Sequence, residues 1–343
     1  MKIALISGAL IPTHPPHYGG LEQVVFDLAC GLTELGHKVV VFATKGSKVP
    51  PKGFLCETIE PAYNVQVNWL GKEMEMYELY KDKLCDFDVI CGHNWFAPEY
   101  LYKGDHPEAH VSHCHHGGLL WRSKPPNVEK LNLIAISRWM QKIYASQGFE
   151  SRVCHDGIDT SRYGFSSDRG SRLLYVGRFT GFKGAHIAIQ VAKRLNMPID
   201  LVGGSFTDDP NYLEEIKRMC DGDSIKMYLD APHETKIRLM QQAKCVLVPS
   251  NFGEPCGLVP IEFMSTGGPA IVWDDGALRE TVADGVTGFV VPKTVEAMID
   301  AVNKVDEIKP EACRKRVEEN FSRQVMARNY LKVYEDILKG NEW

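Results

Sequence analysis

The chain has 343 residues, of which 44% are hydrophobic and 24% charged, a composition typical of a folded protein too long for one ordinary core. A net charge of −5 argues against an extended nucleic-acid surface, and no stretch approaches the ~20 apolar residues of a membrane-spanning helix. The first residues form too short an apolar stretch for a signal peptide and predict a strand. The ten cysteines are scattered without a C-x-x-C pair, so we expect reduced thiols in a cytoplasmic protein rather than disulfides or a zinc site.

Apolar strands alternate with amphipathic helices in both halves of the chain, a pattern typical of parallel α/β sheets. In the first half, strands are predicted at residues 2–7, 38–43, 87–91, 109–113 and 133–137. In the second half, they are predicted at residues 172–176, 199–202, 225–228, 244–248 and 270–273. Of the helices between them, 22–35 is clearest, because its apolar residues recur at helical spacing and Gly36 ends the pattern.

A stretch rich in Gly, Ser, Asp and Arg at residues 156–171 precedes the second series of strands and predicts the linker between two domains. We therefore place the first domain at residues 1–160 and the second at 161–320. The remaining residues, 321–343, contain an apolar-striped helix that ends near Leu338.

The most informative segment of the chain is 249–268, where a buried strand leads into a Gly- and Pro-rich loop and then into a helical pattern. The N–H groups of Gly257, Leu258 and Val259 would open this helix, and a helix N-terminus binds phosphate through such groups and through its dipole. The sequence therefore predicts an anion-binding point at the start of this helix.

Two glutamates flank that point. Glu254 lies in the loop, and Glu262 lies one turn into the helix, where its side chain leans back toward the N-terminus. The alternative is that both are solvated surface residues.

Two cations follow the first strand of the second series. That strand ends at Gly177, and Arg178 and Lys183 come next, at the carboxyl edge where open α/β sheets bind ligands. Arg grips phosphate bidentately and Lys acts as a point charge, so both could stabilise a diphosphate leaving group. The alternative is a pair of solvated loop cations.

This combination resembles the E-x7-E signature of the retaining, GT-B-fold glycosyltransferases of family 4. The resemblance continues along nearly the whole chain, in Gly177-Arg178…Lys183-Gly184, in the Gly-Gly-x-Glu loop around Gly20, and in Gly203-Gly204. It implies two Rossmann-like domains facing across a cleft, with a C-terminal helix that crosses back to the first domain. The sequence is equally compatible with that helix packing on its own domain. Pro255-Cys256 stands where the family usually has Gly-Phe, which leaves the shape of the sugar pocket open.

The resemblance also assigns roles in the first domain. It places Gly20 at the donor diphosphate, His116 at the donor sugar with His115 as the second choice, and His17 and His93 on the acceptor side. Each of these histidines could instead be structural. A metal is not expected at His115 and His116, because adjacent residues on a strand point to opposite faces. His155-Asp156 replaces the family's Pro-Asn, and we expect this to preserve the turn.

The resemblance therefore implies a retaining, metal-independent glycosyltransferase (a hexosyltransferase). Its substrates would be a UDP- or GDP-linked sugar and a hydroxyl acceptor, and no cofactor is expected. The residues implied at the reacting centre are Arg178, Lys183, Glu254 and His116. A nucleotide-sugar hydrolase or epimerase, or a non-catalytic nucleotide-sugar-binding protein, remains an alternative. A Rossmann oxidoreductase fits poorly, because no G-x-G-x-x-G follows the first strand. Peripheral membrane contact is left open by a modest basic patch, made of Arg122, Lys124, Lys130, Arg138 and Lys142.

Overall fold

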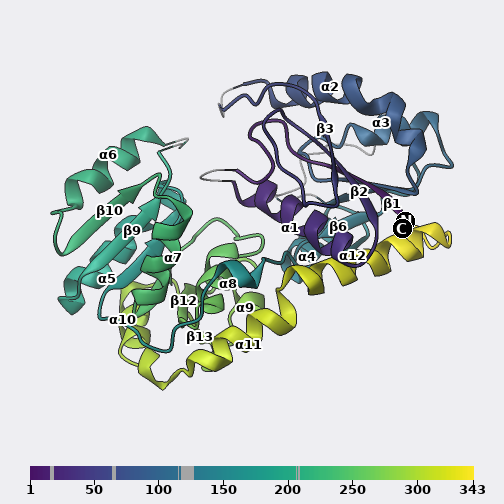
Figure 1. Cartoon of the computed structure of the whole chain (residues 1–343). Coiled ribbons are helices and arrows are strands. Elements are labelled where there is room, and N and C mark those ends of the chain that lie inside the picture. The colour runs from purple at the N-terminus through teal and green to yellow at the C-terminus, as the bar shows by residue number, and fades with distance from the viewer. Residues whose placement is uncertain (16–18, 64–66, 115, 117–126, 206, 208) are drawn as a thin grey trace. The chain divides into compact units, whose positions relative to one another are not determined.

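The structure is a computed structural model that describes residues 1–15, 19–63, 67–114, 116, 127–205, 207 and 209–343. These residues form two compact units (Figure 1). Unit 1 comprises residues 1–15, 19–157 and 323–343, and unit 2 comprises residues 158–322. The chain passes between the units at Gly157–Ile158 and at Ser322–Arg323, close to the predicted boundaries of 160 and 320.

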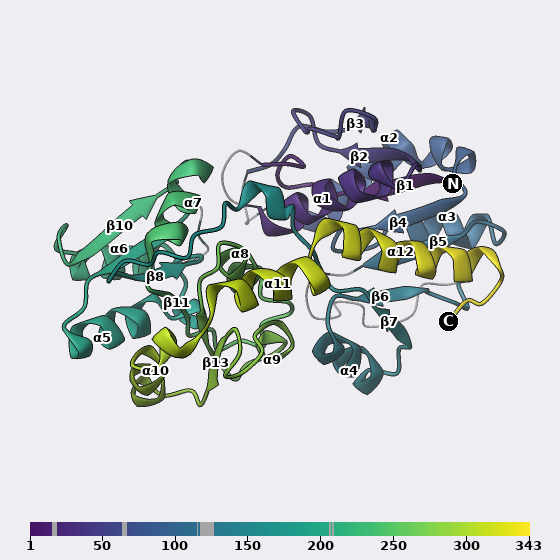
Figure 2. The ribbon, with the colours of Figure 1, turned by 60° about the horizontal axis from the view of Figure 1, so that its bottom comes forward.

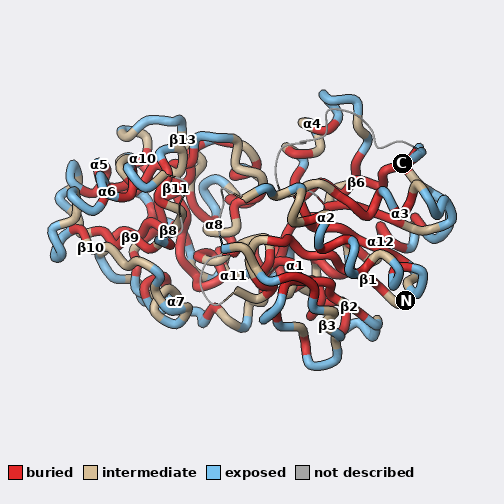
Figure 3. The backbone as a smooth tube through the Cα atoms, turned by 90° about the horizontal axis from the view of Figure 1, so that it is seen from above, coloured by how far each residue is buried: buried red, intermediate tan, exposed pale blue. Residues whose placement is uncertain are grey.

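Unit 1 is built on a parallel sheet with the strand order β3-β2-β1-β4-β5-β6-β7. Its strands are β1 (Lys2–Ile6), β2 (Lys38–Ala43), β3 (Phe54–Glu57), β4 (Val89–Gly92), β5 (Val111–Cys114), β6 (Leu133–Ala135) and β7 (Ser151–Val153). Its helices are α1 (Gly20–Glu34), α2 (Trp69–Tyr80), α3 (Glu99–Asp105), α4 (Arg138–Ser146) and α12 (Arg323–Leu338), with a 3₁₀ turn at Lys81–Asp86. The central strands are buried because helices cover the sheet, as their unbroken apolar runs require (Figure 3).

Helix α12 brings the end of the chain back to the first unit, where it packs along α1 (Figure 2). The approach is close because α1 has a glycine at the contact. A Cβ atom on Gly31 would lie 2.7 Å from the Cβ of Ala327 and 2.8 Å from the carbonyl oxygen of Arg323. Arg323 also pairs with Glu34 at the end of α1. Of the two arrangements that the sequence left open, the structure therefore has the one that the resemblance implied.

Unit 2 repeats the same topology, with the parallel order β10-β9-β8-β11-β12-β13. Its strands are β8 (Leu173–Val176), β9 (Ile199–Gly203), β10 (Ile225–Leu229), β11 (Cys245–Val248), β12 (Ala270–Trp273) and β13 (Gly288–Val291). Its helices are α5 (Ala185–Leu195), α6 (Pro210–Met219), α7 (His233–Gln242), α8 (Leu258–Ser265), α9 (Leu278–Thr281), α10 (Val295–Val302) and α11 (Pro310–Asn320). Short 3₁₀ turns lie at Thr160–Arg162, Gly181–Lys183 and Val305–Glu307.

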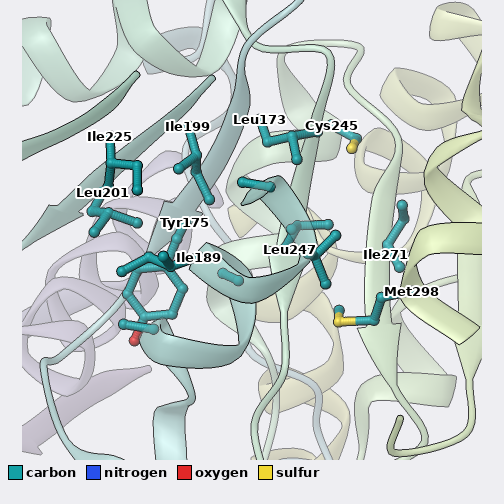
Figure 4. Close-up of a cluster of buried hydrophobic side chains, with 14 of the residues drawn as sticks. Leu173, Tyr175, Ile189, Ile199, Leu201, Ile225, Cys245, Leu247, Ile271 and Met298 are labelled. Atoms are coloured by element: carbon teal, nitrogen blue, oxygen red, sulfur yellow. The ribbon is translucent and has the colours of Figure 1, made fainter. Parts of the chain in front are cut away.

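The core of unit 2 forms between the sheet and the helices α5, α6 and α10 (Figure 4). Strand residues such as Tyr175, Leu201 and Leu247 meet Ile189 of α5 and Met298 of α10 in this core. All five side chains are fully buried, which fixes the sheet against its helices and holds the loops at the strand ends in place.

All ten predicted strands occur, and three further strands, β3, β7 and β13, were not predicted. Each of the three lies at an edge of its sheet. β7 reads Ser-Arg-Val and so has no apolar run, and β3 and β13 are four-residue segments that are only partly buried. Segments this short do not show a clear periodicity in the sequence.

None of the described helices has the length and apolarity needed to cross a membrane.

Candidate functional site

Each sheet has one point at which the order of its strands reverses. In unit 1 the chain moves outward from β1 in one direction and then from β4 in the other, and in unit 2 it does so from β8 and β11. Open parallel sheets bind ligands in the crevice at the carboxyl ends of such strands. Most predicted site residues follow these strands in the sequence, whereas His116 follows β5, the neighbour of β4.

In unit 2 the predicted strand, loop and helix around Glu254 form, with β11 leading into the loop and α8 following it. Helix α8 begins at Leu258, and Gly257 precedes it with φ = 93°, a left-handed conformation that favours glycine. A Cβ atom on Gly257 would also lie 2.8 Å from a methyl carbon of Leu278. Thr281 fixes the preceding residue by donating its hydroxyl to the carbonyl oxygen of Cys256 at 2.7 Å.

Asp275 holds the loop that carries Glu254. Its Oδ2 accepts hydrogen bonds from the backbone N–H groups of Phe252, Gly253 and Glu254, at 3.2, 2.8 and 3.1 Å. Its other oxygen pairs with Lys293. Burial alone would raise the pKa of Asp275, but the Lys293 ammonium and the backbone N–H groups outweigh it and hold the pKa below its usual value.

We expect Asp275→Ala to lower the free energy of unfolding by about 2 kcal/mol, because it removes charge-assisted hydrogen bonds to three N–H groups. Since folding lowers this pKa, the stabilisation is complete above the unfolded-state pKa and is lost as the pH falls through the folded-state value. Urea titrations of both proteins at neutral and acidic pH measure this. A difference that does not shrink on acidification would contradict the role of the charge.

Lys183 and Glu254 meet directly. The Lys183 Nζ lies 2.7 Å from Glu254 Oε2, with 18% and 13% of the two side chains exposed. The Lys183 ammonium also lies 4.5 Å from the ring centroid of Phe252, and Arg178 lies 5.6 Å from that of Phe182. The rings of Phe182 and Phe252 are themselves in contact, with centroids 4.9 Å apart, so the two cations and Glu254 lie near one another at the carboxyl ends of β8 and β11.

Glycines make this region compact. Gly184 has φ = 76°, and a Cβ atom on it would lie 2.5 Å from the carbonyl oxygen of Pro249. A Cβ atom on Gly203 would lie 2.3 Å from the carbonyl oxygen of Gly177. Side chains at these two positions would separate the loops that bring Lys183 to Glu254.

Glu262 has two partners that the sequence did not indicate. Its carboxylate lies 3.0 Å from Lys236 Nζ through both oxygens, and its Oε1 accepts a hydrogen bond of 2.6 Å from the Tyr163 hydroxyl. Burial would raise the pKa of Glu262, but the charge of Lys236 and the Tyr163 hydroxyl lower it below its usual value. Nearby, burial together with Lys236 lowers the pKa of His233 to about 4. Glu262 is thus held as a carboxylate.

In unit 1 a buried histidine pair lies beyond the ends of β4 and β5. His93 Nδ1 lies 3.2 Å from His116 Nε2, and the His93 ring stacks on Tyr330 of α12 at 5.9 Å. Burial and the neighbouring histidines lower the pKa of His93 well below its usual value, so it is neutral at physiological pH. His116 Nδ1 lies 3.6 Å from Asp156 Oδ2.

In unit 1, Glu22 at the start of α1 also has a shifted pKa. Burial raises its pKa to about 7, an effect that its own backbone N–H and the charge of His116 only partly offset. Glu22 therefore titrates near neutral pH beside His116. Glu22 is the last residue of the Gly-Gly-x-Glu motif, but it was not among the predicted site residues, and no sequence signal predicted this pKa.

The structure brings Arg178, Lys183, Glu254, Glu262 and the start of α8 to one edge of unit 2. In unit 1 it brings His93 to His116 and places Gly20 as the first residue of α1. His17, His115, Arg122 and Lys124 lie outside the described residues. Sequence reasoning missed Lys236, Tyr163, Asp156 and the loop-holding role of Asp275, because their partners are distant in sequence.

Several known proteins are similar to this chain in sequence or in fold. The chain is 29% identical over 97% of its length to a glycogen synthase of Mycobacterium tuberculosis, covering 94% of that protein. It superposes with a TM-score of 0.78 on a glycosyltransferase involved in avilamycin A biosynthesis, at 23% identity, covering all of this chain and 99% of the other. An Anabaena protein in complex with UDP and glucose gives 0.74 at 17% identity, with 98% and 99% covered.

Two Rossmann-like units of this topology define the GT-B fold. The family "Glycosyltransferase Family 4" matches residues 18–162, and "Glycosyl transferases group 1" matches residues 164–323. The chain belongs to these group 1 glycosyltransferases and is a sugar-transferring enzyme.

Proposed function

We propose that this enzyme transfers a hexose from a UDP- or GDP-linked sugar to a hydroxyl acceptor, with retention of configuration and without a metal ion. The observation that carries the proposal is the Lys183–Glu254 pair at 2.7 Å beside Arg178 and the N-terminus of α8. Two cations and a helix N-terminus at one strand edge suit a diphosphate, and a paired carboxylate suits the hydroxyls of a sugar. A fold neighbour that binds UDP and glucose supports this substrate class.

In the proposed reaction, the bond between the anomeric carbon and the diphosphate oxygen breaks, and a bond to the acceptor oxygen forms. Arg178, Lys183 and the first N–H groups of α8 stabilise the charge that develops on the leaving diphosphate. The acceptor proton passes to the leaving phosphate oxygen, as the resemblance to retaining family members implies. Because the leaving group takes the proton, no side-chain base is required.

The remaining residues bind and orient. Glu262 accepts hydrogen bonds from the ribose hydroxyls, and Gly257, Leu258 and Val259 present the helix N-terminus to the phosphates. In unit 1 we assign Gly20 to the donor diphosphate, His116 to the donor sugar, and His17 and His93 to the acceptor side. Asp156 orients His116, since its carboxylate lies beside the Nδ1 atom of that ring.

The function is tested first by a thermal-shift screen over UDP-, GDP-, ADP- and TDP-linked sugars, because a ligand that binds the native state raises its melting temperature. Release of diphosphate from the best donor is then measured with and without a panel of sugar and polyol acceptors. Release that depends on the acceptor supports transfer. Equal release without an acceptor would make the protein a hydrolase, and binding without release would make it non-catalytic.

Chelation tests the metal-independent part. We expect transfer to survive dialysis against EDTA, because Arg178, Lys183 and the helix N-terminus supply the positive charge that a divalent ion provides in other transferases. Initial rates before and after dialysis measure this. Loss of the rate on dialysis and its recovery with Mn²⁺ or Mg²⁺ would show that a metal takes part.

A further inference from the structure

In unit 1, Cys114, which has no part in the proposed transfer reaction, converges with His93 and His116. His93 follows β4, Cys114 ends β5, and His116 lies two residues further on. One nitrogen of each imidazole and the Cys114 sulfur all lie within 4.8 Å of one another. Nitrogen and sulfur are the donors that zinc takes in proteins.

Two of the distances between these donor atoms are close to those between two ligands of one zinc ion. Zinc lies at about 2.0–2.1 Å from imidazole nitrogen and about 2.3 Å from thiolate sulfur in a tetrahedral site. These bond lengths place two nitrogens about 3.4 Å apart and a nitrogen and a sulfur about 3.6 Å apart. Here His93 Nδ1 and His116 Nε2 are 3.2 Å apart, and Cys114 Sγ and His116 Nε2 are 3.7 Å apart. The third pair, His93 and Cys114, lies within 4.8 Å, so these two side chains would have to approach by up to about an ångström to share the ion.

Each donor also has an outer partner, as metal ligands in proteins have. Asp156 Oδ2 lies 3.6 Å from the Nδ1 of His116, on the side of the ring away from the cluster. Cys91 Sγ lies 3.5 Å from the Nε2 of His93, the nitrogen that the cluster does not use. The Tyr330 hydroxyl lies 2.9 Å from Cys114 Sγ. The carboxylate–histidine arrangement at Asp156 orients the His116 ring and increases its basicity.

We propose that His93, Cys114 and His116 form a site for Zn²⁺, and that the bound ion inhibits transfer. Binding releases the Cys114 thiol proton to solvent and forms the zinc–sulfur bond. A set of two imidazoles and a thiolate selects zinc over Mg²⁺ and Mn²⁺, which prefer oxygen ligands. The inhibition rests on the proposed function, because it follows from the assignment of His116 to the donor sugar, whereas the binding itself does not.

Cobalt spectroscopy tests the site without reference to activity. Reduced, metal-free protein is titrated with Co²⁺, and we expect one equivalent to produce a sulfur-to-cobalt charge-transfer band in the near ultraviolet and visible d–d bands. One equivalent of Zn²⁺ should abolish both. Absence of these bands in the wild-type protein would overturn the proposal.

Matched variants locate the ligands. Cys114→Ser should lose the near-ultraviolet band, while Cys56→Ser, which alters another cysteine of unit 1 outside the cluster, should keep it. Asp156→Asn should keep the band and weaken zinc binding by about 10–100-fold, because only the outer partner changes. Circular dichroism of the metal-free variants verifies folding, and the Asp156 variant decides the matter if Cys114→Ser does not fold. A band that survives in Cys114→Ser, or zinc affinity unchanged in Asp156→Asn, would contradict the assignment.

Activity then tests the inhibition. We expect Zn²⁺ to stop transfer by the wild-type enzyme, EDTA to restore it, and Asp156→Asn to need about 10–100-fold more zinc for half-inhibition of its own rate. If the cobalt spectrum is as expected but zinc does not affect transfer, the proposed metal site stands and the proposed inhibition is wrong. If no sugar is transferred under any condition, the proposed function fails, while the cobalt spectrum still decides whether the site binds metal.

Discussion

Replacing Arg178 or Lys183 with alanine is expected to lower kcat by about 10²–10³-fold, the usual effect of removing one stabiliser of developing charge. Both cations lie at the carboxyl edge of the unit 2 sheet, and Lys183 is already held at 2.7 Å by Glu254. A leaving diphosphate gains negative charge as its bond to the sugar breaks. These cations therefore act more strongly in the transition state than on the bound substrate, and kcat should fall more than KM rises.

The control is Lys244→Ala. Lys244 directly precedes β11, at the amino edge of the same sheet, and pairs with Asp306 at 2.5 Å. The Lys244→Ala substitution removes one cation from unit 2 but leaves the proposed phosphate site intact, so the kinetics of this variant should match those of the wild type. Melting temperatures accompany the kinetics, because Lys183→Ala also leaves Glu254 without its cation. Wild-type kcat in both Arg178→Ala and Lys183→Ala would refute the assignment of the leaving-group site.

The strand, loop and helix around Glu254 could be predicted from the sequence because each of them is indicated by consecutive residues. A four-residue apolar strand, a loop rich in Gly and Pro, and a helix start at Gly257 are each recorded in consecutive residues. The partners of Glu262 could not be predicted in this way, because Lys236 is 26 residues away and Tyr163 is 99 residues away in the sequence. Only the packing of α7 and of the Thr160–Arg162 turn brings them near, and single-sequence periodicity does not encode packing.

The cluster formed by His93, Cys114 and His116 could not be predicted from the sequence either. Adjacent residues of one strand do point to opposite faces, which argued against a metal at His115 and His116. The cluster instead draws on two neighbouring strands, because Gly92 of β4 pairs with His113 of β5 and so places His93 near Cys114 and His116. Strand neighbourhood depends on sheet order, and the sequence did not specify that order.

The paired glutamates should separate nucleotide binding from sugar transfer. Glu262→Ala should weaken binding of the nucleotide diphosphate product by about 10- to 150-fold, because a hydrogen bond to a charged group contributes about 1.5–3 kcal/mol. Glu254→Ala should leave that affinity nearly intact and reduce turnover, because its proposed partner, the transferred sugar, is absent from the product. Calorimetric titration of both variants with the preferred nucleotide diphosphate measures the difference.

Tyr163→Phe separates the proposed ribose contact of Glu262 from the contacts that this carboxylate makes within unit 2. The Glu262 carboxylate binds Lys236 and Tyr163 as well as the proposed ribose, so its removal could act through these neighbours. Tyr163→Phe removes the 2.6 Å hydrogen bond and keeps the carboxylate and its ion pair with Lys236, so nucleotide affinity should stay within a few-fold of the wild type. If Tyr163→Phe weakens binding as much as Glu262→Ala, the carboxylate organises the loop rather than holding ribose. If instead Glu254→Ala loses product affinity while Glu262→Ala keeps it, the two carboxylates have the opposite roles, with Glu254 at the nucleotide and Glu262 at the sugar.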